Sequence, residues 1–219
     1  MSDTIKIIDV HSHFILPCYL DGLKKMHINP AQEDGFPTPP WSVEGHLAFM
    51  EEAGIDHSIL SLSTPHIHHG DDALAIALCG QINEETSAIC HAHPDKFSLA
   101  ACLPTPSVDG SLAEIAYAYD HLGAVGVKVA SNNNGVYLGD PSLDPIFEEL
   151  NRRKAVITIH PSRAQATPNN VFTSGPAPLF EYIADTTRAV LNMITNGTLE
   201  KYPDIKVIVP HSGSFLPFV

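Results

Sequence analysis

Four histidines stand where short apolar runs end, and their side chains are of the type that binds metal ions. They are His11, His13, His160 and His211. The first two form a His-x-His pair, and side chains two residues apart on a strand point to the same face. Neutral imidazole is the commonest metal ligand in proteins and suits zinc and several other transition metals. Two imidazoles at this spacing can therefore converge on one ion.

His211 differs from the other three because it lies in a turn-like segment, between Pro210 and the pair Ser212-Gly213. Such a turn can hold an imidazole over a bound metal, either as an acid/base group or as an additional ligand. Asp9 has the same strand parity as both members of the His-x-His pair. Its carboxylate either orients these imidazoles or caps the strand.

Apolar runs alternate with helix-like segments along the whole chain. The apolar runs are 5–10, 57–62, 97–102, 125–130, 155–160 and 205–210. The helix-like segments are 42–54, 72–93, 109–122, 143–153 and 178–200. The runs are nearly continuous in aliphatic residues, as strands buried on both faces are. A strand followed by a helix, repeated, predicts a parallel sheet with helices packed outside it.

Two α/β architectures fit this order: an open doubly wound sheet, or six units of a (β/α)8 barrel. The Gly-x-Gly-x-x-Gly turn of a dinucleotide-binding sheet is absent after the first strand, where His-Ser-His stands instead. The segments 14–41 and 161–178 are long and polar, and loops at this end of barrel strands build active sites. We expect one domain over 1–219, with a loop insertion at about 14–41.

The composition limits the kinds of molecule that the chain is expected to bind. The 219 residues carry 12 Lys and Arg against 25 Asp and Glu, a net charge of −13, which disfavours nucleic acid and anionic membranes. No apolar run approaches the roughly 20 residues that a membrane span needs. The cysteines are predicted to be free thiols, which suits the cytoplasm: Cys18, Cys79, Cys90 and Cys102. A cytoplasmic protein with a small-molecule substrate is expected.

Several segments together resemble the amidohydrolase superfamily. They are Asp9-Val10-His11-Ser12-His13-Phe14, the stretch 137–150, and Ile159-His160-Pro161-Ser162. Within the superfamily, the chain is most similar to the aminocarboxymuconate-semialdehyde decarboxylase branch, which includes salicylate-type and resorcylate-type decarboxylases. The run Thr38-Pro39-Pro40-Trp41-Ser42 is similar to members that act on 6-methylsalicylate.

The resemblance implies a distorted (β/α)8 barrel with one divalent metal, zinc in first place and manganese as the alternative. It implies that His11, His13 and His160 are metal ligands, completed by an aspartate after strand eight, and that His211 is the catalytic histidine. The implied reaction is the non-oxidative decarboxylation of a hydroxybenzoate-like or muconate-type carboxylic acid, so the chain would be a carbon–carbon lyase. A metal-dependent hydrolase of an amide, ester or lactone, with a carboxylated Lys128, is the alternative.

The sequence departs from the family pattern at its end. It stops shortly after the sixth predicted strand, and no aspartate follows Asp204, so the fourth ligand has no candidate. We therefore expect a barrel truncated after strand six. The residues leave open whether the chain is an inactive fragment or is completed by a partner, such as a second copy in a homo-oligomer.

Other polar residues allow two interpretations each. Trp41, His68 and Arg163 are candidates for substrate binding, but the first can simply anchor its loop and the others lie in polar loops. Without a carboxylated side chain, the Lys128 ammonium is expected to meet a carboxylate or a carbonyl at its strand end. The segment Asn132-Asn133-Asn134-Gly135 is typical of a turn. The cluster His66-Ile67-His68-His69-Gly70-Asp71 follows the second strand on the active-site side, where it either binds a substrate carboxylate or forms a solvated loop. Six other histidines are interpreted as structural: His27, His46, His57, His91, His93 and His121.

Overall fold

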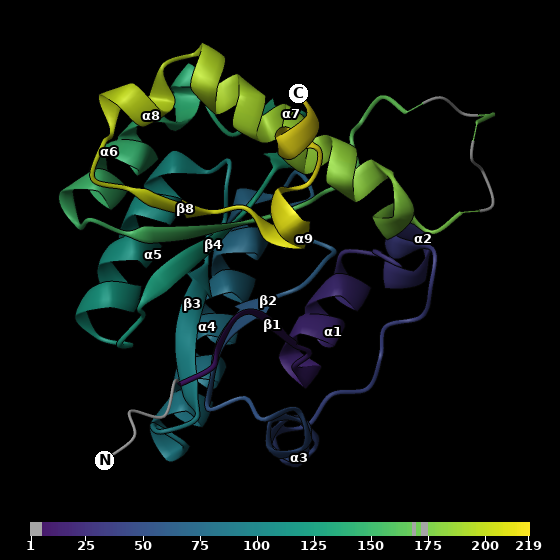
Figure 1. The fold of residues 1–219 in the computed structure, drawn as a ribbon, viewed down its shortest axis with the longest axis vertical. Coiled ribbons are helices and arrows are strands. Elements are labelled where there is room, and N and C mark those ends of the chain that lie inside the picture. Colours follow the sequence, from purple (N-terminus) through teal and green to yellow (C-terminus); the bar gives the residue numbers. More distant parts are fainter. Residues whose placement is uncertain (1–5, 168–169, 172–174) are drawn as a thin grey trace.

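The computed structural model describes residues 6–167, 170–171 and 175–219, and its centre is a six-stranded parallel sheet (Figure 1). In order across the sheet, the strands are β1 (Ile8–Phe14), β2 (His57–Leu62), β3 (Phe97–Cys102), β4 (Gly126–Ala130), β7 (Val156–His160) and β8 (Lys206–Ile208). Each strand lies beside the one that precedes it along the chain, apart from the short antiparallel hairpin of β5 (Asn132–Asn133) and β6 (Val136–Tyr137). Among the described strands, β1 and β8 form the two edges.

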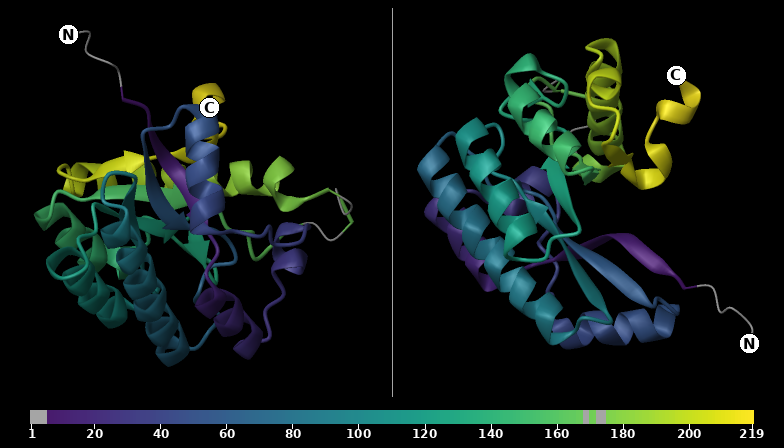
Figure 2. Two further views of the ribbon diagram at one scale, coloured as in Figure 1. Left: turned by 90° about the horizontal axis from the view of Figure 1, so that it is seen from below. Right: turned by 90° about the vertical axis from the view of Figure 1, so that its left-hand side faces the viewer.

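Helices connect the strands. They are α1 (Pro17–Lys25), α2 (Pro30–Asp34), α3 (Val43–Ala53), α4 (Asp72–Ala92), α5 (Val108–Asp120), α6 (Asp144–Arg152), α7 (Glu181–Thr195), α8 (Thr198–Lys201) and the short α9 (Pro210–Gly213). Figure 2 shows that the sheet curves, with α4, α5 and α6 along one side. Strand β1 and the segment after β8 lie on the side away from these three helices.

Local sequence sets the helix ends. Ser42 begins α3 because its hydroxyl accepts a hydrogen bond from the Gly45 backbone N–H at 3.1 Å. Asp71 begins α4 in the same way, because its carboxylate accepts from the Leu74 backbone N–H at 3.0 Å. Gly54 ends α3 with φ of +69°, a left-handed conformation that glycine adopts without steric cost.

Two large apolar clusters fix the sheet against the helices. One packs β4 and β7 against α6 and α7, with Val127 and Ile159 at its centre. The other packs β1 and β2 against α1 and α4, with Phe14 and Leu60 almost fully buried. Burial on this scale holds the strands in register, so the polar residues at their carboxyl ends are presented at one edge.

The strand order decides between the two predicted architectures. A doubly wound sheet reverses its strand order at a switch point, whereas a barrel adds each strand beside the last. The observed order follows the chain without reversal, and the sheet curves, so the barrel prediction is confirmed over six strand–helix units. No described helix is long and apolar enough to cross a membrane.

Element boundaries differ from expectation in three places. The first strand continues to Phe14, so the His-x-His pair lies within β1 rather than after it. The segment 14–41, expected as a loop, contains α1 and α2. The helix expected over 178–200 is divided at Gly197, whose φ of +69° separates α7 from α8.

Candidate metal centre

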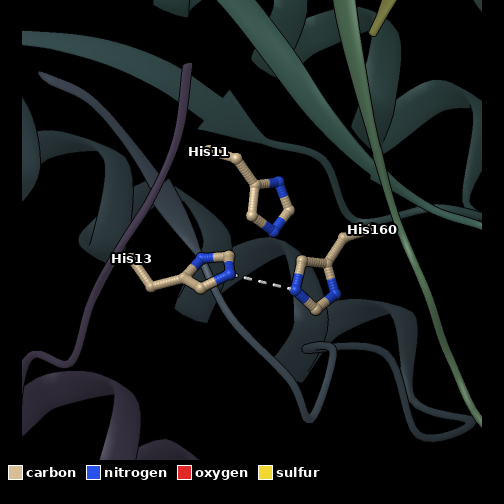
Figure 3. Close-up of side chains that lie close together, drawn as sticks. All are labelled: His11, His13 and His160. Atoms are coloured by element: carbon tan, nitrogen blue, oxygen red, sulfur yellow. Dashed lines mark hydrogen bonds between the residues drawn. The ribbon is translucent and has the colours of Figure 1, made fainter. Parts of the chain in front are cut away.

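Three of the four predicted histidines converge. His11 and His13 come from β1 and His160 ends β7, and their candidate ligand nitrogens all lie within 4.8 Å of one another. Figure 3 shows the three rings directed at a common point, with a dashed line joining His13 and His160. The Nε2 atoms of these two residues are 3.2 Å apart.

The geometry depends on the curvature of the sheet and on an irregularity in β1. Strands β1 and β7 are not neighbours, so their histidines can meet only because the sheet bends round. The pairing of β1 with β2 shifts by one residue between Asp9 and Ser12, as at a β-bulge. Asp9 accepts a hydrogen bond from the His11 backbone N–H at 3.0 Å. Its carboxylate therefore stabilises the irregular strand, which matches the capping alternative.

Hydrogen bonds define the tautomers of two of these imidazoles. Nδ1 of His13 lies 3.2 Å from the carbonyl oxygen of Ser61, and Nδ1 of His160 lies 3.0 Å from that of Pro161. A carbonyl only accepts, so each Nδ1 carries the proton and each Nε2 has a free lone pair. A backbone carbonyl behind the ring is the usual second partner of a metal-binding histidine.

The imidazoles of His11, His13 and His160, called the triad below, fit a metal cation for two reasons. Two unprotonated Nε2 atoms at 3.2 Å repel each other unless a positive charge lies between or beside them. In addition, both ring nitrogens of His11 are buried and have no hydrogen-bond partner among the described residues. Buried polar atoms without a partner are rare in folded proteins, and a metal ion would satisfy them.

Burial also keeps the imidazoles in the form that binds metal. It lowers the pKa of His11 to about 4 and the pKa of His13 to about 3. The pKa of His160 is held well below its usual value, first by burial and then by the Lys128 charge. All three side chains are therefore neutral at pH 7 and available as ligands.

His211 lies beside the triad but outside the group of three converging nitrogens. Its ring centroid is 5.1 Å from that of His11 and 6.5 Å from that of His160. His211 and Ser212 have φ of +54° and +56°, a left-handed conformation that costs free energy in residues with a side chain. The residue as a whole is exposed, but desolvation of its ring beside His11 lowers the pKa of His211. The chain thus holds a neutral imidazole next to His11 in a strained turn.

The three residues predicted to bind substrate are divided between two hollows. His68 and Arg163 line a cavity of about 250 Å3, together with Asn132 and His66. Trp41 lines a more open hollow of about 610 Å3 that His11 and His13 also line. The structure therefore does not bring Trp41 together with the other two in one cavity.

Two of these candidates have structural contacts as well. The indole N–H of Trp41 donates to His46 Nδ1 at 3.0 Å, and its ring meets Phe14 edge-on. His68 is buried, with Nε2 bonded to Asp72 at 2.8 Å. Arg163 is exposed at the cavity rim. Trp41 therefore anchors its loop, which was one of its two interpretations.

Two further histidines contact the site. His46, interpreted as structural, accepts from Trp41, and its Nε2–H donates to Ser12 Oγ at 3.1 Å, between His11 and His13 in β1. His66 is half-buried and packs against His160, with ring centroids 5.7 Å apart. The histidine cluster after β2 was expected on the active-site side, and its contact with His160 agrees with that placement.

Lys128 has partners that the sequence only half predicted. Its ammonium group lies 2.6 Å from His66 Nδ1 and 3.4 Å from the carbonyl oxygen of Ser63. The carbonyl was expected and the imidazole was not. Burial lowers the pKa of Lys128 to about 7.

A buried carboxylate fixes the segment that follows β4. Asp185 of α7 is fully buried and accepts from Ser131 Oγ, from Asn132 Nδ2 at 2.8 Å and from Tyr137 OH at 2.6 Å. The Ser131 backbone N–H in turn donates to the His160 carbonyl at 2.8 Å. Asp185 therefore ties α7 to the segment after β4, and Ser131 of that segment is bonded to His160 at the end of β7.

Comparison with proteins of known sequence places these features in a family. Residues 8–217 match the family described as Amidohydrolase. The decarboxylase macB of Penicillium terrestre is 37% identical, a match that covers 97% of this chain and 65% of that protein. The 6-methylsalicylic acid decarboxylase of Penicillium expansum is 33% identical, and this match covers 97% of this chain and 65% of that protein. The chain thus spans about two thirds or less of the length of these curated relatives.

Solved structures agree with the fold. The crystal structure of an amidohydrolase II is 38% identical and superposes with a TM-score of 0.93, covering 98% of this chain and 69% of that one. The 5-carboxyvanillate decarboxylase LigW2 of Novosphingobium aromaticivorans, solved with bound manganese, is 25% identical with a TM-score of 0.84, over 97% and 68%. On sequence and structure together, the chain belongs to the amidohydrolase family.

Proposed function

We propose that this chain carries the metal site of a non-oxidative decarboxylase, a carbon–carbon lyase acting on a small aromatic or muconate-type carboxylic acid. The observation that carries the proposal is the convergence of three neutral imidazoles, those of His11, His13 and His160. The reaction class comes from the relatives, because macB and the enzyme of Penicillium expansum are decarboxylases.

We assign one divalent metal to the triad. Three neutral imidazoles favour zinc, and manganese is the alternative because LigW2 was solved with it. Such an ion supplies Lewis-acid chemistry: it stabilises negative charge on a substrate oxygen. The three imidazoles of the site are neutral, so they leave the positive charge of the ion intact. This attracts an anionic substrate in spite of the net charge of −13.

His211 is proposed as the catalytic histidine. Its imidazole is neutral at pH 7 because desolvation of the ring lowers its pKa, so it can accept a proton from a substrate hydroxyl or a water molecule. In the proposed reaction, the imidazolium of His211 then gives this proton to the ring carbon that bears the carboxylate. The bond from that carbon to the carboxylate then breaks and CO2 leaves.

The two hollows supply the remaining contacts. The hollow beside Trp41, which is lined by two of the metal ligands, suits a flat aromatic ring. The cavity beside Arg163 and His68 offers a guanidinium and amide groups, and no carboxylate lines it among the described residues. We propose that a polar substituent of the substrate occupies this second cavity.

A hydrolase with two metals is the alternative, supported by the lowered pKa of Lys128, which makes its amine more reactive toward CO2. Against it, the Lys128 amine is already bonded to His66 and is not among the three converging ligands.

We also propose a cytoplasmic location, which the free cysteines suit, and no nucleic-acid partner.

Metal-reconstituted protein incubated with a panel of hydroxybenzoates tests the proposal. We expect CO2 release from at least one ortho-hydroxybenzoate and none from the His11→Ala variant. No turnover across the panel by protein that holds its metal would contradict the decarboxylase assignment. Metal analysis separates the alternatives, because about one ion per chain fits the decarboxylase and two fit the hydrolase.

A further inference from the structure

Lys128 is a buried amine without an ion-pair partner. The residue is 2% exposed, and it forms no salt bridge within the described part of the chain. Its bonds go to His66 Nδ1 at 2.6 Å and to the Ser63 carbonyl at 3.4 Å. Burying a lysine in this way is costly, and such residues often have a specific role.

His66 must have a single tautomer at this position. Its Nε2 lies 3.2 Å from the carbonyl oxygen of Pro161, which can only accept, so Nε2 carries the proton. Nδ1 of the neutral ring is therefore a bare acceptor, and Lys128 is the donor that it needs. The assignment holds whether the lysine is charged or neutral, because both forms have N–H groups.

The same Pro161 carbonyl also accepts the proton on Nδ1 of His160, at 3.0 Å. One oxygen thus receives hydrogen bonds from two imidazoles. The rings of His66 and His160 meet edge to face, at 81°. Any rotation of the His66 ring would change both its hydrogen bond to the shared Pro161 carbonyl and its packing against His160.

We propose that Lys128 and His66 are positioning residues for the metal ligand His160. Lys128 fixes the tautomer of His66. His66, together with the Pro161 carbonyl, fixes the ring of His160 so that its Nε2 faces His13. This inference rests on the metal site proposed above, but it concerns the orientation of a ligand and not the reaction.

Imidazole nitrogen NMR of the metal-free, full-length chain gives a direct readout. In the unsubstituted protein we expect the proton of His66 on Nε2 and the proton of His160 on Nδ1. In Lys128→Met, which keeps the aliphatic stem and removes the donor, the His66 Nδ1 resonance should move to that of an unbonded nitrogen. The His160 Nδ1 resonance should shift as well, because the His66 ring packed against His160 loses its fixed orientation. A lysine that bonds to His66 without positioning His160 predicts no such shift of the His160 resonance in a variant that folds. A proton on His66 Nδ1 in the unsubstituted protein would overturn the proposal by itself.

Zinc affinity is the second readout. Loss of a partner that orients a ligand typically weakens metal binding by about 10–100-fold, and we expect a loss in this range for Lys128→Met. Lys128→Gln, which retains an N–H donor, should recover part of it. The exposed Lys96→Met is the matched control and should bind zinc as the unsubstituted chain does. Zinc affinity of Lys128→Met within twofold of the unsubstituted value would refute the positioning role.

These outcomes are separable from the proposed function. If the hydroxybenzoate panel shows no turnover while the tautomers and zinc affinities behave as expected, the decarboxylase assignment fails and the positioning role stands. If Lys128→Met does not fold, the tautomers of the unsubstituted chain and the zinc affinity of Lys128→Gln still decide the question.

Discussion

The rings of His11 and His211 lie edge to face with centroids 5.1 Å apart, although they come from opposite edges of the sheet. His11 is on β1, and His211 follows β8. The two edges approach each other because the sheet curves, as Figure 2 shows. The site therefore depends on the whole sheet, and a distortion at either edge reaches the converging histidines.

The first prediction separates ligands from the neighbouring imidazole. His11→Ala and His160→Ala should each lower zinc affinity by about a hundredfold or more, because each removes a proposed ligand. Activity should fall in parallel. His211→Ala should retain most of the zinc and lose turnover, because its ring is not one of the three converging groups. Zinc titration of the three variants, followed by assays of zinc-loaded protein, checks this. Equal loss of zinc in all three would make His211 a ligand.

The second prediction concerns metal removal. An ion that binds only the folded chain stabilises it by about 2.7 kcal/mol at a free concentration 100 times its dissociation constant. Chelation should therefore lower the thermal unfolding midpoint by several degrees, and added zinc should restore it. Differential scanning calorimetry with and without chelator measures the shift. His13→Ala is the control, since its midpoint should not respond to zinc.

Much of this site could be predicted because its signals are local in sequence. His160 and His211 stand next to apolar runs, and the parallel sheet follows from the alternation of strands with helices, so the shared edge could be inferred. The His-x-His pair was recognisable from spacing alone. The extent of β1 was not, because its irregularity between Asp9 and Ser12 depends on pairing with β2.

The residues that sequence reasoning undervalued act through contacts between distant segments. Lys128 meets His66, and Asp185 meets Ser131, across long stretches of chain. Spacing along the chain carries no information on such contacts. The hydrogen bond from His46 to Ser12 likewise depends on how α3 packs beside β1. For this reason the three converging histidines could be named from the sequence, whereas the groups bonded around them could not.

The third prediction is a loss of stability of the metal-free chain in mild acid. Burial lowers the pKa of His11 to about 4 and that of His13 to about 3, from 6.5 in the unfolded chain. Between pH 6.5 and about 4 the unfolded state therefore binds more protons than the folded state. The free energy of unfolding should be fully retained above pH 6.5 and should fall as the pH drops through this range.

Urea denaturation of chelated protein at pH 7, 6 and 5 measures the effect. Each such histidine lowers the free energy of unfolding by about 1.4 kcal/mol for each pH unit in this range. His11→Asn removes one titrating group, so its slope should be smaller than that of the unsubstituted chain. A free energy of unfolding that is constant from pH 7 to pH 5 would show that the imidazoles are not buried in their neutral form.

The last prediction concerns Asp185, the buried carboxylate that ties α7 to the segment after β4. Asp185→Ala leaves Ser131 Oγ, Asn132 Nδ2 and Tyr137 OH without their acceptor. A stranded buried donor costs about 1–3 kcal/mol, so the free energy of unfolding should fall by about 3 kcal/mol or more. Because the Ser131 backbone N–H holds the His160 carbonyl, zinc affinity should fall as well.

Asp144→Ala is the matched control for that variant. The Asp144 carboxylate is 36% exposed and its partner Lys201 is 55% exposed, an ion pair of the surface type that contributes less than about 1 kcal/mol. Urea denaturation and zinc titration of both variants give the comparison. If Asp185→Ala were no less stable than Asp144→Ala, the bonds of Asp185 to Ser131, Asn132 and Tyr137 would not stabilise the fold. If it lost stability but kept its zinc affinity, these bonds would have no effect on the orientation of His160.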